Sequence, residues 1–314
     1  MSITAIANRA ADGDPRAAAG AWDPVEFHEA AGARIALSRR GQGPAVVCLH
    51  ATGHGARDFE LLADRIGDSF EVLAVDWPGQ GRSPRESAPA SAARYSAILE
   101  ELLPQLVAGP AIVIGCSVGG AAALAAAARR PELFRALVLC DTGGLVELDA
   151  AARFFITRMT SFFEAGARGA RWFPMAFALY YRMVLPGRPA RPQRGRIVAS
   201  AREIAPILAQ SWKSFAAPEA DLRPLIPRVA CPTLFAWAKQ DRVIPWSRNK
   251  AAAARFRDAR VEFFRAGHAA FLEDPDRFAE VFRGFVATLA REHEAASGPG
   301  SRTGTGSGKA AVSA

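Results

Sequence analysis

The sequence predicts an α/β fold built on a mostly parallel sheet, and three observations support this prediction. The chain has 314 residues, 50% of them hydrophobic, which is enough for one large domain with a substantial core. Short apolar runs, typical of strands buried on both faces, alternate with segments whose apolar residues recur at helical spacing. This alternation stops between residues 145 and about 225 and then resumes. We therefore expect one sheet domain with helices on both faces, interrupted by a helical insertion.

The individual elements follow in order along the chain. Strands are predicted at the segments VEFHEA, RIALSRR, AVVCLH, FEVLAVD, AIVIGC, RALVLCD, PTLFAWA and RVEFFRA. Helices are predicted at the segments ARDFELLADRI, YSAILEELLPQLV, AAALAAAARR, SRNKAAAARF and DPDRFAEVFRGFVATLAREH. Inside the insertion, helix-like pieces rich in aromatic residues flank a segment predicted to be a loop, PGRPARPQRGR.

Composition sets the expected domain boundaries. We expect a flexible segment over residues 1–22 and a disordered, low-complexity tail over residues 295–314. The sheet domain is predicted to comprise residues 23–144 and 226–294, and the helical insertion residues 145–225.

The sequence offers no targeting or membrane signal. No apolar run reaches the roughly 18 to 20 residues that span a bilayer, and the N-terminus lacks the charged and apolar regions of a secretory signal. The four cysteines are scattered without metal-ligand spacing, as expected for buried, reduced thiols. We therefore predict a cytoplasmic protein without a membrane span.

One short stretch, VIGCSVGG at residues 113–120, carries the strongest signal of chemistry. It joins a predicted strand to a predicted helix and matches the pattern G-x-S-x-G, in which a serine occupies a very tight turn. The residues two positions before and after that serine must be small, and Gly115 and Gly119 meet this requirement. The helix N-terminus behind the turn offers free N–H groups. The pattern predicts that Ser117 is a nucleophile.

A serine hydroxyl needs a base to become nucleophilic, and His268 is the best-placed histidine. It follows the last predicted strand, so it should lie at the same edge of the sheet as Ser117. By contrast, His28 falls inside a predicted strand and His293 lies near the end of the chain.

The base in turn needs an orienting carboxylate, and two positions at this edge of the sheet could supply it. Asp241 follows one predicted strand by three residues, and Asp141 directly ends another. The chain order serine, acid, histidine accompanies this kind of serine turn. We therefore predict Asp241 as the acid, with Asp141 as the alternative.

At this point the sequence resembles the α/β-hydrolase superfamily, in its capped branch, over roughly residues 25–292. The matching segments occur in the family's order and are LHATGHGARDF, VDWPGQGRS, GCSVGG, WAKQDRVIP and AGHAAFLEDPDRF. The resemblance implies an eight-stranded, mostly parallel sheet with a helical cap inserted after the sixth strand. It also implies that Ser117 is the nucleophile, Asp241 the acid and His268 the base.

The resemblance further implies an oxyanion hole made by the N–H groups of Thr52 and Val118. His50 is expected to support the loop that carries Thr52. The family usually has glycine after this histidine, where the present chain has Ala51, and glycine at the start of the acid motif, where it has Ala238.

These features predict a serine hydrolase that cleaves a carboxylic ester, lactone or thioester through an acyl-enzyme at Ser117, with no metal or organic cofactor. A serine at this turn argues against dehalogenases and epoxide hydrolases, which use a carboxylate nucleophile. Three alternatives within the fold stay open: a C–C bond hydrolase of ring-cleavage keto acids, a cofactor-free perhydrolase or haloperoxidase-like enzyme, and an acyltransferase. A non-catalytic binding protein on the same fold is a fourth, which an intact triad disfavours.

The expected substrate is a small ester-like molecule, and His54, Trp77, Trp172 and Phe173 are the candidates for contacts with it. Residues 151–215 carry eleven basic and two acidic side chains, a net charge of +9, whereas the whole chain carries +8. These basic residues either face solvent or make the cap favour an anionic substrate. They match no motif that reads nucleic acid, so no nucleic-acid partner is expected, and no oligomeric state is predicted.

Overall fold

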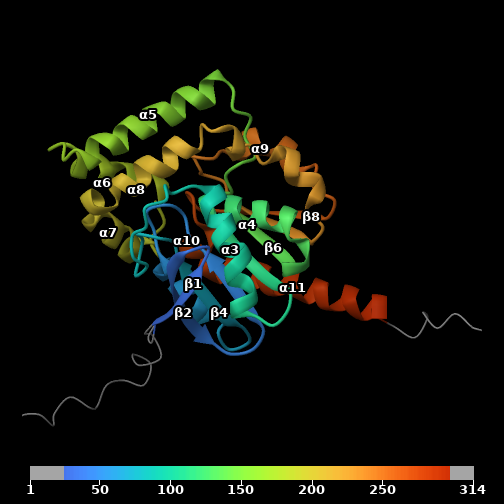
Figure 1. Ribbon diagram of the computed structural model, residues 1–314. Helices are drawn as coiled ribbons and strands as arrows, with labels where there is room; N and C mark the ends of the chain where they lie inside the picture. Colours follow the sequence, from blue (N-terminus) through green and yellow to red (C-terminus); the bar gives the residue numbers. More distant parts are fainter. Residues whose placement is uncertain (1–24, 298–314) are drawn as a thin grey trace, which may run out of the picture.

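A computed structural model describes residues 25–297, and Figure 1 follows them from the first strand in blue to the last helix in red. The flexible segment predicted over residues 1–22 lies outside the described residues. The last helix continues to Ser297, so only the part of the predicted tail from residue 298 onward lies outside them. Within the described part of the chain, every helix is too short or too polar to cross a membrane.

One eight-stranded sheet forms the centre of the molecule, which confirms the predicted fold class. Its strands are β1 (Val25–Ala30), β2 (Ala33–Gly41), β3 (Ala45–Leu49), β4 (Glu71–Asp76), β5 (Ala111–Cys116), β6 (Phe134–Cys140), β7 (Thr233–Ala238) and β8 (Ala259–Phe264). Their order in the sheet is β1-β2-β4-β3-β5-β6-β7-β8. Strand β2 runs antiparallel to both of its neighbours, and all other neighbouring strands are parallel. The loops that follow the parallel strands therefore meet at one edge of the sheet.

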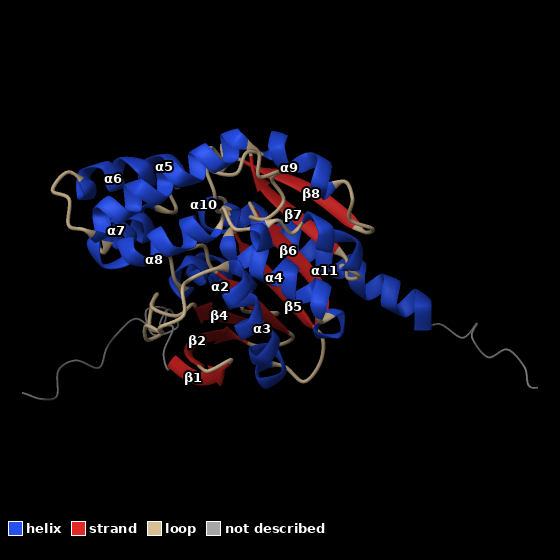
Figure 2. Ribbon diagram, turned by 45° about the horizontal axis from the view of Figure 1, so that its top comes forward, coloured by secondary structure: helices blue, strands red, loops and turns tan. Residues whose placement is uncertain are grey.

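Helices cover both faces of the sheet, because alternate residues of each strand point to opposite sides. In β3, Val46 and Cys48 belong to one apolar cluster, and Val47 and Leu49 belong to the other. The first cluster includes residues of α2 (Glu60–Ile66), α10 (Ala270–Glu273) and α11 (Pro275–Ser297). The second includes residues of α3 (Ala92–Leu106), α4 (Val118–Arg129) and α9 (Trp246–Ala253). Figure 2 shows the strands in red with helices on either side.

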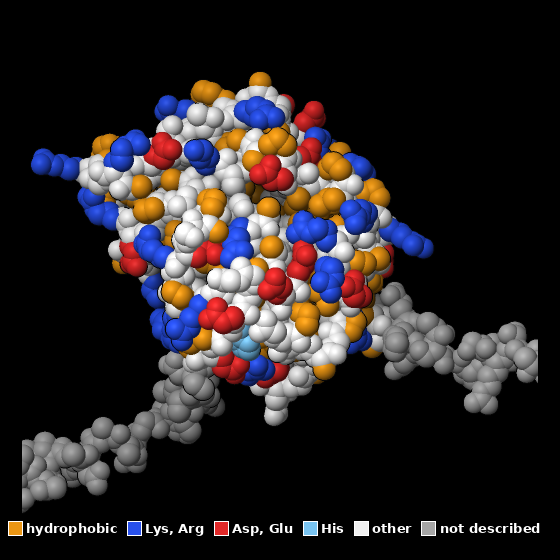
Figure 3. All heavy atoms as spheres, viewed as in Figure 1, with side chains coloured by type: hydrophobic (Ala, Val, Ile, Leu, Met, Phe, Trp, Pro, Cys, Tyr) orange, Lys and Arg blue, Asp and Glu red, His pale blue; other side chains and the backbone are white. Residues whose placement is uncertain are grey.

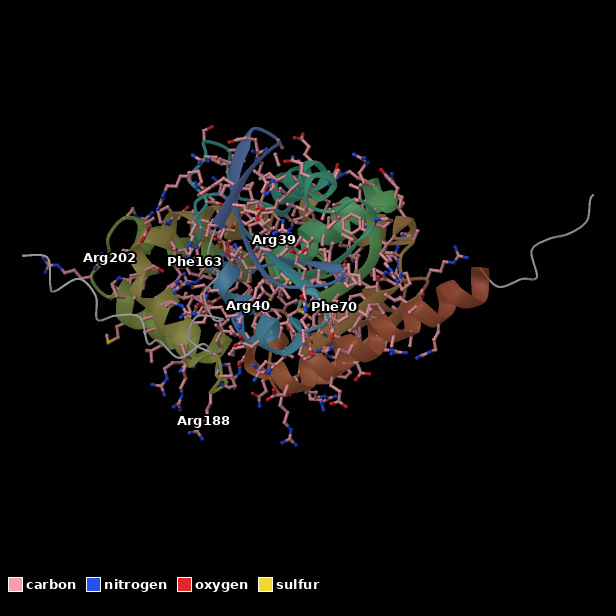
Figure 4. All side chains as sticks on the ribbon, turned by 90° about the horizontal axis from the view of Figure 1, so that it is seen from below. Arg39, Arg40, Phe70, Phe163, Arg188 and Arg202 are labelled. Carbon is pink, nitrogen blue, oxygen red and sulfur yellow. The ribbon has the colours of Figure 1, made fainter. Side chains whose placement is uncertain are left out.

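Between β6 and β7 the chain leaves the sheet and forms a group of helices, which we call the helical insertion. It contains α5 (Ala150–Ala167), α6 (Phe173–Val184), α7 (Arg191–Ala199) and α8 (Ala201–Ser214). These helices lie together at one end of the molecule (Figures 1 and 2). Aromatic packing holds them together: the ring centroid of Phe163, labelled in Figure 4, lies 6.3 Å from that of Phe177 and 6.1 Å from that of Trp212.

The segment PGRPARPQRGR is not entirely a loop, and the prediction for it was wrong from residue 191 onward. Helix α7 begins at Arg191, with Pro192 in its first turn. Proline is tolerated there because the N–H groups of a first turn have no intrahelical acceptor. Gln193 and Ile197 are buried on the inner side of this helix. Tertiary packing therefore stabilises a helix in a segment whose local composition favours a loop.

Candidate active site

Ser117 occupies the turn between β5 and α4. Its backbone has φ 53° and ψ −115°, a strained conformation for a residue other than glycine. The turn leaves no room for side chains on either flank. A Cβ atom on Gly115 would lie 2.7 Å from the Gly119 carbonyl oxygen, and one on Gly119 would lie 2.5 Å from the Leu49 carbonyl oxygen. These short distances explain why glycine stands at both positions of the pattern.

His268 and Asp241 form a buried pair at the same edge of the sheet. His268 Nδ1 donates to Asp241 Oδ2 at 2.8 Å, and Asp241 Oδ1 accepts the N–H groups of Val243 at 2.7 Å and Ile244 at 3.0 Å. Burial by itself lowers the pKa of His268, but the charge of Asp241 and its hydrogen bond outweigh burial, so the pKa is raised. Because Asp241 occupies Nδ1, Nε2 is the ring nitrogen left for proton transfer to and from Ser117.

The alternative acid, Asp141, makes different contacts. It is fully buried, and its Oδ1 accepts the N–H group of Ala238 at 2.9 Å. Burial, together with the charge of Asp241, raises the pKa of Asp141 well above its ordinary value. Its Oδ2 has no hydrogen-bond partner among the described residues, which fits a protonated carboxyl group better than a charged one. The structure therefore pairs His268 with Asp241 and places Asp141 behind that carboxylate.

Glu273 fixes the backbone of the loop that carries His268. Its Oε1 accepts the N–H groups of Gly267 at 2.8 Å and His268 at 3.0 Å, and its Oε2 accepts the N–H group of Gly187 at 2.7 Å. Gly187 lies between α6 and α7, so one carboxylate ties the histidine loop to the helical insertion. None of the sequence motifs points to Glu273. Its position five places after His268, in AGHAAFLEDP, is the only signal that the sequence offers.

Thr52 and Val118 lie on the two segments that border the serine turn. Val118 is the first residue of α4, where N–H groups have no intrahelical acceptor, and Thr52 lines the cavity into which Ser117 opens. The Thr52 hydroxyl donates to Ser211 Oγ at 2.8 Å, which fixes its loop against α8. Both N–H groups therefore belong to segments held close to the nucleophile.

His50 supports this loop from behind, and it does so together with Trp77. The Trp77 N–H group donates to His50 Nε2 at 3.0 Å, and His50 Nδ1 donates to the Ala51 carbonyl oxygen at 2.7 Å. Burial lowers the pKa of His50, which favours the neutral ring that can both accept and donate. Trp77 is fully buried and stacks on Tyr95, with ring centroids 4.5 Å apart. It does not line the cavity and is therefore not placed to contact the substrate.

A cavity of about 310 Å³ joins the sheet edge to the helical insertion, and both Ser117 and His268 line it. Most of its wall is apolar. The insertion contributes to this wall the side chains of Phe155, Ile156, Tyr180, Tyr181, Leu208 and Trp212. The loop after β3 contributes His54.

Of the remaining candidates for substrate contacts, His54 lines the cavity, whereas Trp172 and Phe173 do not. Phe173 is fully buried inside the insertion, where its ring centroid lies 5.2 Å from that of Phe177. Trp172 is 50% exposed. About two turns further along α6, Tyr180 and Tyr181 line the cavity instead.

The basic residues of the insertion stay on its surface. Among the described residues, none of the eleven basic side chains within residues 151–215 lines the cavity, and Figure 4 shows Arg188 and Arg202 projecting outward. Basic side chains are dispersed among acidic and apolar ones over the face visible in Figure 3. The two arginines that do line the cavity, Arg242 and Arg248, follow β7. Of the two alternatives for these basic residues, the structure therefore favours the one in which they face solvent.

Metal-ligating side chains are dispersed in the described part of the chain. Within residues 25–297, no three histidine, cysteine, aspartate or glutamate side chains come together in a way that could hold a metal ion. Three cysteines, Cys48, Cys116 and Cys140, are buried in strands, and Cys231 is partly exposed, each as a free thiol.

Comparison with known proteins identifies the class to which this fold and site belong. A family model described as "Alpha/beta hydrolase family" matches residues 46–281. This match covers well over half of the chain. The chain therefore belongs to the alpha/beta hydrolase family and is a hydrolytic enzyme of that fold.

Among its relatives is the pimeloyl-[acyl-carrier protein] methyl ester esterase of Xanthomonas oryzae pv. oryzae (strain MAFF 311018). It is 28% identical over 254 residues, which cover 79% of this chain and 97% of the relative. The solved structure of a thermophilic esterase from Thermogutta terrifontis has a TM-score of 0.70 at 20% identity, covering 85% of this chain and 99% of that one. An enol-lactonase from Burkholderia xenovorans LB400 has a TM-score of 0.68 at 19% identity, covering 83% and 100%. These two structures share the fold of this chain.

Proposed function

We propose that this enzyme hydrolyses a carboxylic ester through an acyl-enzyme formed on Ser117. One observation carries the proposal: Ser117, in its strained turn, and His268 line the same cavity. Asp241 holds His268 there through a hydrogen bond of 2.8 Å between Oδ2 and Nδ1. The methyl ester esterases among the curated relatives match this chain over 97% of their own length, and they support an ester as the bond attacked.

The contacts support the following sequence of steps. Ser117 Oγ attacks the ester carbonyl carbon while His268 Nε2 accepts the hydroxyl proton, and Asp241 stabilises the imidazolium that forms. The carbonyl oxygen becomes an oxyanion and accepts the N–H groups of Thr52 and Val118, each typically worth about 3 kcal/mol. The C–O bond to the alcohol then breaks, and the alcohol takes the proton from His268. Water, deprotonated by His268, finally cleaves the acyl-enzyme and restores Ser117.

The helical insertion, expected over residues 145–225, acts in this proposal as a cap over the reaction centre. It supplies much of the apolar cavity wall, and none of the basic side chains within residues 151–215 lines the cavity. An uncharged and largely apolar acyl group is therefore the substrate class that the cavity fits best.

The test is to label the enzyme with a fluorophosphonate and to map the modified residue by mass spectrometry. The label should sit on Ser117, and Ser117→Ala should lower kcat for a p-nitrophenyl ester by about 10⁴-fold to 10⁶-fold. Circular dichroism must show that the variant stays folded. Substantial hydrolysis by folded Ser117→Ala would overturn the proposal. A panel that adds lactones and dienone acids separates ester cleavage from C–C bond cleavage.

A further inference from the structure

A second histidine–carboxylate pair lies in the cavity wall, apart from His268 and Asp241. His54 Nδ1 donates to Asp58 Oδ2 at 2.6 Å, and the two side chains are 2% and 0% exposed. His54 lines the same cavity as Ser117. No step of the proposed hydrolysis uses this pair, although a buried carboxylate is costly unless it is well paired.

The helical insertion fixes the orientation of this pair. Gln193 Nε2 of α7 donates to Asp58 Oδ1 at 2.6 Å, and Arg196 Nε donates to Gln193 Oε1 at 2.7 Å. Both oxygens of Asp58 thus act as acceptors, which places a proton of His54 on Nδ1. In the neutral imidazole, Nε2 is then a hydrogen-bond acceptor, and it has no partner among the described residues.

Tyr181 adds a hydroxyl group beside His54. Helix α6 places Tyr181 in the cavity wall, where its ring centroid lies 5.6 Å from that of His54. The side chain is only 2% exposed, and within the described residues its hydroxyl makes no hydrogen bond. Burial, followed by the influence of Tyr180 and the charge of Asp58, raises the pKa of Tyr181 well above its ordinary value. The hydroxyl therefore keeps its proton and can donate it.

Of the common substituents, an uncharged hydroxyl fits both protein groups. It can donate to His54 Nε2 and accept from the Tyr181 hydroxyl at the same time, whereas a ketone only accepts and leaves Nε2 without a donor. A carboxylate would bring a second negative charge close to Asp58. A plain methylene would leave both buried polar groups unpaired, which typically costs about 1–3 kcal/mol for each group.

We propose that His54 Nε2 and the Tyr181 hydroxyl form a subsite that binds a hydroxyl substituent on the acyl part of the substrate. Both side chains are nearly fully buried and line the same cavity as Ser117, whereas Arg242 and Arg248, which also line it, are exposed to solvent. The acyl group stays bound to Ser117 after the alcohol has left, so we assign the two buried side chains to the acyl part of the substrate. This inference rests on the proposed ester hydrolysis at Ser117 and names its substrate class as hydroxyacyl esters.

The test compares kcat/KM for matched esters of one alcohol. One ester carries a hydroxyl on its hexanoyl chain, and its partner carries a methyl group on the same carbon. The position of the substituent is moved along the chain from one matched pair to the next. The unchanged enzyme should prefer the hydroxyl ester at one position by about tenfold or more, the size expected when a buried hydrogen-bonding site loses its partner.

Two substitutions remove the two halves of the subsite. In His54→Asn the side-chain amide can still donate to Asp58, but no atom replaces Nε2 as an acceptor. Tyr181→Phe removes only the hydroxyl group. Each should reduce the hydroxyl preference by about tenfold. Tyr180→Phe is the matched control, because it removes a hydroxyl from the next residue of the same helix, and it should retain the preference.

The outcomes distinguish this inference from the proposal on which it rests. If the unchanged enzyme shows no hydroxyl preference at any position, the subsite is wrong. It is equally wrong if His54→Asn and Tyr181→Phe lower kcat/KM for both esters alike, which is what a merely structural role would give. Fluorophosphonate labelling is the separate readout. Absence of labelling at Ser117 overturns the ester hydrolysis itself, whereas labelling without hydroxyl preference overturns only the subsite.

Discussion

At the scale of single residues, Asp241 and Asp141 show how two neighbouring carboxyl groups acquire different roles. Asp241 accepts two backbone N–H groups and the ring proton of His268, all of which stabilise its charge. Asp141 accepts one backbone N–H group, is fully buried and faces the charge of Asp241. The raised pKa of Asp141 therefore favours its protonated form, whereas Asp241 is the carboxyl group that accepts from His268.

This division of roles predicts unequal effects of two isosteric substitutions. Asp241→Asn should lower kcat by about 10⁴-fold, because the amide no longer holds the imidazole in the required tautomer. Asp141→Asn should cost far less, since its amide can still accept the Ala238 N–H group and an uncharged amide replaces a carboxyl group whose raised pKa favours the uncharged form. Steady-state kinetics on both variants, with unfolding curves as the control, measure the difference. The reverse result would place the acid after β6.

The raised pKa of His268 predicts the direction of the pH dependence. His268 must be neutral to accept the proton of Ser117, so kcat/KM should fall as the pH decreases through the pKa of His268. Because Asp241 raises that pKa, the midpoint should lie above 6.5, the reference value for histidine. In Asp241→Asn the two largest raising effects are lost, and only the smaller ones of Glu273 and Asp58 oppose the lowering effect of burial, so the midpoint should move to lower pH. A midpoint that stays in place would show that Asp241 does not raise this pKa.

At the scale of elements, the connection from β8 to α11 depends on a contact with the helical insertion. Helix α10 has only four residues, and its last residue, Glu273, accepts N–H groups from the histidine loop and from the segment between α6 and α7. The position of His268 is therefore coupled to the position of the insertion. The same holds for the second pair in the cavity, where Gln193 of α7 holds Asp58.

We predict that Glu273→Gln weakens both stability and catalysis. In glutamine an NH₂ group replaces one of the two side-chain oxygens, and this group cannot accept the backbone N–H groups that the oxygen accepted. Leaving a buried N–H group without an acceptor typically costs about 1–3 kcal/mol of folding stability. Urea unfolding measures the loss of stability, and kcat for a neutral ester measures the displacement of His268. Glu219→Gln, at an exposed position, is the control. Unchanged stability and kcat in Glu273→Gln would show that the loop holds itself in place.

At the scale of the whole molecule, the basic side chains of the insertion lie apart from the cavity that Ser117 and His268 line. Residues 151–215 of the helical insertion carry a net charge of +9, yet none of their basic side chains lines the cavity, to which the insertion contributes apolar side chains. Exposed charges more than a Debye length apart are largely screened, and that length falls from about 10 Å at 0.1 M salt to about 3 Å at 1 M. Surface arginines of the insertion should therefore have little influence on a substrate inside the cavity.

We predict that arginines lining the cavity, but not those on the surface of the insertion, influence the ratio of kcat/KM for a carboxylated ester to kcat/KM for its neutral analogue. The double variant Arg188→Gln and Arg202→Gln should leave this ratio unchanged at low and at high salt, because both side chains project outward. Arg242→Gln, at a position that lines the cavity, should lower the ratio. A salt-sensitive change in the double variant would mean that the surface charge of the insertion does reach the substrate.

The fold could be predicted from the sequence because its signals are local. Buried parallel strands are continuous apolar runs, helices show their spacing, and the serine turn needs glycine at Gly115 and Gly119. The chain order of the motifs then places Ser117, Asp241 and His268 at one edge of the sheet. Helix α7 was not predicted, because the composition of its segment favours a loop. Burial against other elements stabilises the helix instead.

By itself, the sequence determined the sheet, the site of the helical insertion and the edge at which the reactive side chains meet. The tertiary structure decided which carboxylate holds His268, that Glu273 clamps its loop, and that Trp77 and Phe173 are packed in the core. It also decided that the cavity is lined by tyrosines and by His54 rather than by the arginines of the insertion. The physical reason is the same in each case. Periodicity fixes which element a residue belongs to, but only the packing of distant elements fixes what its side chain contacts.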